Sequence, residues 1–278
     1  MKSPSPIFHL SQSNLQDFDD CPRRFQLKTI DNTAWPAAYL EPLSQLEKAT
    51  NLGNKFHQLC QRFFSGIDSD CILDNITDPD LKNIFENFIP FANQLKSKYL
   101  FTEIVLSTPF LGHQLIAKFD LLIKTIDGHY VIYDWKTAAK KPSRSLLSKR
   151  FQTFLYPYIL AKAGKGIFNS EDPPLDIISM IYYYPLSSDP EEIFPYSTDL
   201  YSEHTFLLTK IISEISAHVD SGEVFPRTND HDHCQRCVYR SLCERGTQVG
   251  SVDLFTEIEQ EDLSGEHFDF DNIIEIEF

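Results

Sequence analysis

The stretch His129-Tyr-Val-Ile-Tyr-Asp-Trp-Lys-Thr137 is the segment around which we predict the fold. It is rich in β-branched and aromatic residues, which are typical of a strand. Because side chains alternate along a strand, Asp134 and Lys136 point to the same face. A carboxylate that holds a cation, beside a lysine that steadies an attacking water, suits phosphodiester hydrolysis. Such a triplet is common at exposed strand ends, so its meaning depends on partners elsewhere in the chain.

The preceding segment, His113 to Thr125, is predicted to form a strand that pairs with this stretch through a hairpin at Asp127-Gly128. In a hairpin with a two-residue loop, the numbers of the two residues in each cross-strand pair sum to 255, and Asp120 then faces away from Asp134. A three-residue loop over 126–128 pairs numbers that sum to 254 and sets Asp120 directly across from Asp134. Two carboxylates that close repel each other unless a cation lies between them. We therefore predict an odd-length loop or a bulge, and a metal ion shared by the two aspartates.

The composition indicates a globular protein with a full core. The chain has 278 residues, of which 42% are hydrophobic and 13% aromatic. It contains no apolar run of membrane-spanning length and begins without a signal-like apolar segment, so we expect no membrane association. The six cysteines are therefore expected in a reducing cytoplasm, where grouped cysteines indicate metal more often than disulfides.

The net charge of −15 is unevenly distributed. Residues 247–278 hold ten acidic residues and no lysine or arginine, which leaves 30 acidic and 25 basic residues before them. We predict one domain over 1–246 and an acidic tail over 247–278. The tail alternates apolar and acidic residues near its end, so it is either a solvated tail or a strand that docks back on the domain. Six basic residues of the domain form either a nucleic-acid-binding groove or a solvated surface. They are Lys136, Lys140, Lys141, Arg144, Lys149 and Arg150.

The remaining pattern predicts helices on both sides of the strand region. A capping box of Ser13 and Gln16 is expected near the first helix start, and Gly164 is expected to cap the helix after the central strands. Gln152 and Tyr156, four residues apart, share one face of that helix. His57, at the edge of an apolar stripe, is either a packed core residue or a ligand. The expected helices cover about 44–64, 78–99, 143–163 and 199–219, and two further strands cover 101–110 and 175–184.

Three cysteines near the C-terminal end form a metal-binding pattern. Cys234, Cys237 and Cys243 follow a Cys-x2-Cys-x5-Cys spacing. A zinc ion or an iron–sulfur cluster both fit three thiolates and a fourth ligand. The fourth ligand is either Cys21 or one of the nearby histidines, His231 and His233. Cys60 and Cys71 are interpreted as non-ligands.

Several motifs, in this order, resemble the RecB-like nucleases of the PD-(D/E)xK superfamily. The resemblance covers roughly residues 7 to 246 and is carried by the order and spacing of the motifs. These are His9-Leu10-Ser11-Gln-Ser13 with Cys21-Pro22-Arg23-Arg24-Phe25, Gly53-x3-His57, Ala117-x2-Asp120, Asp134-Trp-Lys136-Thr137 and Gln152-x3-Tyr156. Cys21 with the three C-terminal cysteines resembles the split 4Fe–4S ligand set of AddB-type and CRISPR-associated members.

The resemblance implies a fold, an activity and a set of site residues. It implies an α/β, restriction-endonuclease-like core with a central mixed β-sheet flanked by helices. It implies a Mg²⁺ or Mn²⁺ ion held by His57, Asp120, Asp134 and the carbonyl of Trp135. Lys136 would orient the attacking water, while Gln152 and Tyr156 would support the site or contact DNA.

The implied activity is that of a metal-dependent DNA nuclease acting on single strands or duplex ends. The expected setting is recombination and repair or CRISPR adaptation, with other proteins of those systems as partners. The alternative is a non-catalytic iron–sulfur or zinc module of the same fold that binds DNA. The presence of Asp120, Asp134 and Lys136 favours the enzyme.

Overall fold

The computed structural model describes residues 6–33, 41–168 and 172–246, and the acidic tail predicted over 247–278 lies outside these ranges. The strands are β1 (His9–Leu10), β2 (Ser97–Phe110), β3 (His113–Thr125), β4 (Tyr130–Trp135), β5 (Ile178–Tyr183) and β6 (Glu191–Pro195). The helices are α1 (Gln12–Asp20), α2 (Pro22–Phe25), α3 (Glu41–Phe64), α4 (Ser69–Asp74), α5 (Pro79–Ala92), α6 (Arg144–Leu147), α7 (Phe151–Phe168), α8 (Thr198–Ser221) and α9 (His231–Arg236), with a π-helical turn η1 (Gln26–Ile30) and a 3₁₀ turn η2 (Leu175–Ile177).

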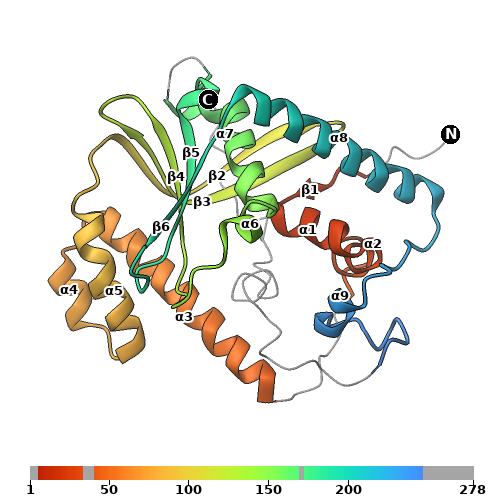
Figure 1. Cartoon of the computed structure of the whole chain (residues 1–278), viewed down its shortest axis with the longest axis horizontal. Helices are drawn as coiled ribbons and strands as arrows, with labels where there is room; N and C mark the ends of the chain where they lie inside the picture. Colours follow the sequence, from red (N-terminus) through yellow and green to blue (C-terminus); the bar gives the residue numbers. More distant parts are fainter. Residues whose placement is uncertain (1–5, 34–40, 169–171, 247–278) are drawn as a thin grey trace.

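The described strands form one mixed, six-stranded sheet. Its order is β1-β3-β4-β5-β6, and β2 pairs with β3 along nearly the full length of both. The pairs β1–β3 and β4–β5 are parallel and the others are antiparallel. Together with helices on both faces (Figure 1), this confirms the α/β fold with a central mixed sheet.

Two hydrophobic clusters lie on opposite sides of the sheet. The first joins α1, α2, α7 and α8 to the sheet and contains Phe119, Ile132 and Met180. The second joins α3, α4 and α5 to the other face and contains Tyr133 and Trp135. The central strands are thus covered on both faces, which explains why β4 is buried at every position. Within the described ranges, no helix combines the length and apolarity needed to cross a bilayer.

The hairpin between β3 and β4 has the predicted odd-length loop. Lys124 pairs with Tyr130 and Leu121 with Tyr133, which is the register whose numbers sum to 254. Thr125 N–H donates to the carbonyl of His129 at 2.8 Å, and Gly128 has a φ of +96°. The glycine thus takes the left-handed conformation that a three-residue loop needs.

Three expectations about the helices are wrong. The capping box at the start of α1 is formed by Ser11 and Asn14, because Asn14 supplies the reciprocal side-chain oxygen. The helix predicted to extend towards Tyr99 ends at Ala92, and β2 begins at Ser97. The helix predicted over 143–163 is split into α6 and α7, and α7 continues past Gly164 to Phe168.

The regular alternation of side chains along β3 is interrupted at Asp120. Phe119 packs in the first cluster, whereas Leu121 packs in the second. In a regular strand, residues two apart point to the same face, so the alternation shifts by one residue between them. Asp120 lies at this shift.

Strand β2 shows the same shift at the position opposite. Phe101 and Ile104 both pack against the first cluster although they are three residues apart. Between them, Glu103 has a φ of +52°, a left-handed conformation that is unusual and costly for a glutamate inside a strand. In both strands the alternation of side chains between the two faces of the sheet therefore shifts at the same place, the pair of Glu103 and Asp120.

Candidate active site

Asp134, on β4, and Lys136, directly after the end of that strand, form a buried ion pair. Lys136 Nζ lies 2.8 Å from Asp134 Oδ2, and both side chains are almost completely shielded from solvent. The Gln152 amide, in the first turn of α7, donates a hydrogen bond to Asp134 Oδ1. Asp134 is therefore engaged on both oxygens, by a cation and by a neutral donor.

Tyr156 lies one turn after Gln152 and is also buried. Its ring meets the edge of Phe119 at a centroid distance of 5.1 Å. Burial, and secondarily the nearby Asp134 carboxylate, raise the pKa of the Tyr156 hydroxyl. The phenol therefore stays protonated at neutral pH, so it can act as a hydrogen-bond donor but not as a base.

Asp120, on β3, is held by two groups. Its Oδ1 lies 3.1 Å from His57 Nδ1, and its Oδ2 accepts the backbone N–H of Trp135 at 2.8 Å. Burial alone would raise the pKa of Asp120, but the charge and hydrogen bond of His57 outweigh it and hold the pKa below its usual value. The carboxylate is therefore ionised at neutral pH.

His57, on α3, bridges Asp120 and the end of β4. Its Nε2 lies 3.0 Å from the carbonyl oxygen of Trp135. Both ring nitrogens thus face oxygen acceptors, an arrangement that suits a protonated ring or a ring beside a bound cation.

Glu103 joins His57 and Asp120 in one group, although the sequence alone suggests for it only an outer carboxylate of the site or an ordinary strand residue. One donor atom from each of the three lies within 4.8 Å of the others, and among the described residues no second group of three His, Cys, Asp or Glu meets this condition. Burial, then the neighbouring Asp120, raise the pKa of Glu103, while Lys118 at 2.6 Å opposes the rise. Crowding of two carboxylates and an imidazole fits a site that a cation completes.

The register of β2 and β3 was the signal that could have found Glu103. A two-residue loop at Leu111-Gly112, both with positive φ, pairs residues whose numbers sum to 223. This register sets Glu103 opposite Asp120.

The ligand set therefore differs in part from the one implied by the resemblance. The structure brings together His57, Asp120 and the Trp135 carbonyl, as expected, and adds Glu103. Asp134 lies outside this group and is instead bound by Lys136 and Gln152. Carboxylate and carbonyl oxygens with one imidazole are ligands that suit Mn²⁺ or Mg²⁺ better than a soft metal.

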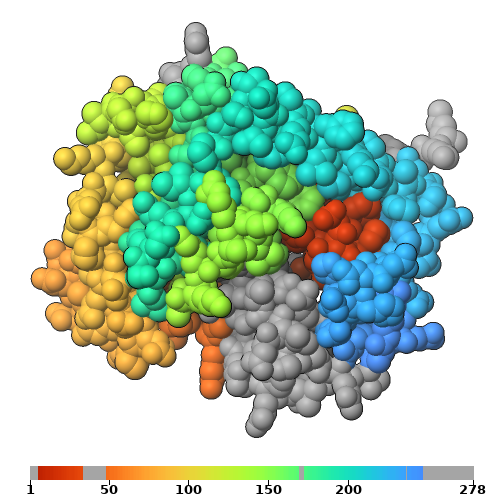
Figure 2. Space-filling view, in the orientation of Figure 1, coloured from red at the N-terminus to blue at the C-terminus, as the bar shows by residue number. Residues whose placement is uncertain are grey.

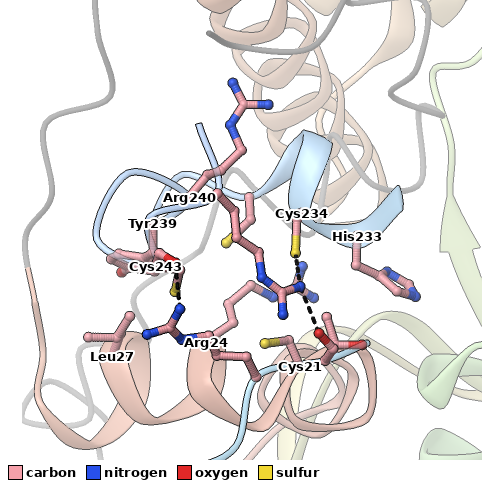
Figure 3. Close-up of a pocket in the computed structure, with 12 residues that line it drawn as sticks. Cys21, Arg24, Leu27, His233, Cys234, Tyr239, Arg240 and Cys243 are labelled. Carbon is pink, nitrogen blue, oxygen red and sulfur yellow. Dashed lines mark hydrogen bonds between the residues drawn. The ribbon is translucent and has the colours of Figure 1, made fainter. Parts of the chain in front are cut away.

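The four cysteines singled out in the sequence line one pocket (Figure 3). Cys21 lies between α1 and α2, and Cys234, Cys237 and Cys243 lie in and after α9. Figure 2 shows the N-terminal helices, in red, directly beside the C-terminal segment, in blue, and the backbone N–H of Arg23 donates to the carbonyl of Pro226. The pocket therefore joins segments from the two ends of the described chain.

The surroundings of the cysteines are rich in arginine. Arg245 donates to Cys234 Sγ at 3.1 Å, and Arg24, held by Asp17 and Asp20, lies near Cys237. Burial raises the pKa of Cys237 to about 11, although Arg24 opposes the rise. Cys60 is buried in the second cluster and Cys71 is exposed, so neither lies in this pocket.

The proposed basic groove is partly neutralised. Lys141 pairs with Asp189 at 2.6 Å and with Glu192 at 3.2 Å, and Arg144 also pairs with Glu192. Lys141 and Arg144 further donate to the outward-facing carbonyls of β6, so they cover that edge of the sheet. Lys136 is paired with Asp134. Three of the six basic residues are therefore committed to acidic partners.

One family model and several known proteins are similar to this chain. A family model described as "PD-(D/E)XK nuclease superfamily" matches residues 9–244. The curated "Uncharacterized protein UU146" of Ureaplasma parvum serovar 3 is 28% identical over 122 residues, which is 44% of this chain and 58% of that relative. This chain thus spans less than two thirds of that relative's length.

Two solved structures are similar over most of the chain. A protein from Eubacterium rectale named "Putative exonuclease" matches with a TM-score of 0.48 and 11% identity, covering 80% of this chain and 84% of that one. The structure named "SSO0001" matches with a TM-score of 0.40 and 13% identity, covering 87% and 88%. The family assignment depends on the family model, which spans the whole candidate site. This chain belongs to the PD-(D/E)XK nuclease superfamily.

Proposed function

We propose that this chain is a metal-dependent DNA nuclease that cleaves phosphodiester bonds at single strands or ends of DNA, in recombination and repair or CRISPR adaptation. The observation that carries the proposal is the buried Asp134–Lys136 ion pair beside the donor group of His57, Glu103 and Asp120. The two features meet at Trp135, whose backbone contacts both Asp120 and His57.

Each side chain has a proposed role. His57, Glu103, Asp120 and the Trp135 carbonyl would hold Mg²⁺ or Mn²⁺, which supplies an activated water and positive charge next to the phosphate. Lys136 would steady the attacking water or the charge that develops on the phosphorane.

The other residues would support Lys136. Asp134, kept in place by Gln152, would orient the ammonium group. Direct ligation of the cation by Asp134, as the resemblance implies, requires that Lys136 release one carboxylate oxygen.

The burial of the site supports a narrow substrate. Asp120, Asp134 and Lys136 are 9%, 4% and 5% exposed. An unpaired strand or a frayed end presents its phosphates to such a recessed site more easily than the middle of a duplex. We also propose a reducing compartment such as the cytoplasm for this chain, because grouped cysteines there bind metal more often than they form disulfides.

A cleavage assay tests the proposal. Labelled single-stranded DNA, the matching duplex and RNA of the same sequence are incubated with Mn²⁺ or Mg²⁺. Wild-type protein is expected to cut the single strand, and Asp120→Asn or Lys136→Met to cut at least about 100-fold more slowly. Glu86→Gln, an exposed change on α5, is the control. Equal activity in all variants would reject the proposal, and binding without cleavage by the wild type would support the non-catalytic alternative.

We further propose that Cys21, Cys234, Cys237 and Cys243 hold a [4Fe–4S] cluster, with zinc as the alternative. The support is the meeting of four thiols, from the two ends of the described chain, around one pocket, which offers one thiolate for each iron of a cluster. A tetrahedral zinc ion also takes four thiolates, so metal analysis must separate the two.

Anaerobic purification followed by iron and zinc analysis tests the assignment. A brown protein absorbing near about 400 nm is expected, and Cys237→Ser should lose the colour. Stoichiometric zinc in a colourless protein would reject the cluster.

A further inference from the structure

Trp135 contacts the candidate site through its backbone only. Its N–H donates to Asp120 Oδ2 and its carbonyl oxygen faces His57 Nε2, so one residue touches two members of the donor group. The next residue, Lys136, donates its N–H to the carbonyl of Tyr183 at 2.9 Å, which fixes the chain to β5. Small shifts of Trp135 would therefore change the distance between Asp120 and His57.

The indole ring of Trp135 points away from this group into the second cluster and is only 1% exposed. It stacks on Phe64 at a centroid distance of 6.1 Å and an angle of 13°. Phe88, at 5.1 Å, meets it edge-on, and Tyr183 does so at 6.0 Å. The ring is thus enclosed by aromatic groups from α3, α5 and β5.

The contacts of Trp135 with α3 lie at two points of one helical face. His57 faces its carbonyl and Phe64 stacks on its ring, and these two helix residues are seven positions apart. Seven residues are two turns, or about 10.5 Å along the axis, and place both on the same side of α3. One residue therefore fixes both the distance and the tilt of α3 relative to the end of β4.

We propose that the Trp135 indole is a positioning group that sets the placement of His57 opposite Asp120. This proposal rests on the proposed function in assigning His57 and Asp120 to a metal site. The ring does not approach the reacting atoms, and it acts through α3 and through the Trp135 backbone. A smaller side chain at position 135 would let α3 move relative to the sheet, although none of the proposed metal-binding side chains would be substituted.

The test compares Trp135→Leu and Trp135→Phe with Phe91→Leu. Phe91, on α5, packs against the same cluster, stacks on Tyr183 at 3.9 Å and meets the Trp135 ring edge-on at 6.2 Å, but it has no role in the donor group. Phe91→Leu therefore removes aromatic packing beside the indole while leaving the indole itself and its contact with Phe64 on α3 in place. Urea unfolding confirms that the variants being compared are folded.

Two readouts follow the position of His57. In metal-free protein labelled with ¹⁵N-histidine, the His57 ring resonances, assigned with His57→Gln, report its two hydrogen bonds. In the second readout, Mn²⁺ titration without DNA gives the affinity. Trp135→Leu is expected to move the ring resonances towards those of an exposed histidine and to weaken Mn²⁺ binding at least about tenfold, as expected when the support of a ligand is removed. Trp135→Phe should fall between it and the wild type, and Phe91→Leu should stay within about twofold.

Unchanged His57 resonances in Trp135→Leu would overturn the inference, as would an equal change in Phe91→Leu. If Trp135→Leu does not fold, Trp135→Phe and Phe91→Leu carry the same comparison. Neither readout uses DNA cleavage. A wild-type protein that places His57 as described but does not cut DNA would reject the proposed function and leave this inference standing.

Discussion

Replacing Lys136 by methionine should destabilise the protein by about 3–5 kcal/mol, the typical cost of removing one partner from a buried ion pair. Lys136 and Asp134 are 6% and 5% exposed in their side chains, with 2.8 Å between Nζ and Oδ2. Water cannot replace the lost ammonium group at such burial. Gln152 continues to donate to Asp134, but a neutral donor compensates only part of the charge.

The matched double variant, Asp134→Asn with Lys136→Met, should lose much less stability than either single variant. It leaves neither charge buried, and the asparagine oxygen can still accept from Gln152. Asp134→Asn alone removes the carboxylate that lies 2.8 Å from the buried Lys136 ammonium group, so that group loses the negative charge of this partner. We therefore expect a coupling energy of at least about 2 kcal/mol between the two sites.

Urea unfolding followed by circular dichroism measures all four proteins, and the cleavage assay is run on the same preparations. The double variant should be well folded and inactive, which separates the chemistry of the pair from its role in stability. A loss below about 1 kcal/mol in Lys136→Met, or simple additivity in the double variant, would refute the buried-pair reasoning.

Three further predictions test other parts of the structure. Burial and Asp120 raise the pKa of Glu103, so the ionised side chain destabilises the metal-free fold above that pKa. Glu103→Gln should therefore raise the Tm of the metal-free protein at pH 7 and reduce the Tm increase that Mn²⁺ gives the wild type. A lower Tm of the metal-free variant would contradict this. Gly164→Ala should lower the free energy of unfolding by about 1–3 kcal/mol, because the new Cβ would lie 2.8 Å from Pro173 Cγ. At Gly166 a new Cβ meets nothing within 4 Å, so Gly166→Ala should raise the free energy of unfolding by about 0.5–1 kcal/mol; urea unfolding measures both. Because a thiol must lose its proton to bind metal, the raised pKa of Cys237 predicts higher metal content after reconstitution at about pH 8.5 than at about pH 6.5, and equal content would contradict it.

The parts of the fold that could be predicted from sequence are those that local chemistry determines. Strand β3 has the predicted bounds, His113–Thr125, because turn residues mark both of its ends. The hairpin register followed from Gly128 and from the repulsion between two aspartates. The meeting of Cys21 with the three C-terminal cysteines was one of the alternatives that spacing left open, and the structure brings these four together.

The break between α6 and α7 has no periodicity signal in the sequence and is accompanied by side-chain contacts of Thr153. The Thr153 hydroxyl donates to the carbonyl of Leu147, a group that would accept from Phe151 N–H in a continuous helix, and it also lies 2.8 Å from the Tyr182 hydroxyl on β5. Gly164 was interpreted as a helix end, but its role is packing against Pro173. Strand β6 was missed because it is short and its outer edge is covered by Lys141 and Arg144 instead of by a further strand.

Glu103 shows why the candidate site is harder to predict than the fold around it. As one acid in a β-rich segment, it has no local signal, and alternation alone gives it no reason to meet His57. It reaches the site because β2 and β3 change sides of the sheet together, at Glu103 and Asp120. The left-handed backbone of Glu103 carries a local cost in free energy. A cation between Glu103, Asp120 and His57 would repay it, which is why we regard the irregular backbone and the donor group as two aspects of one site.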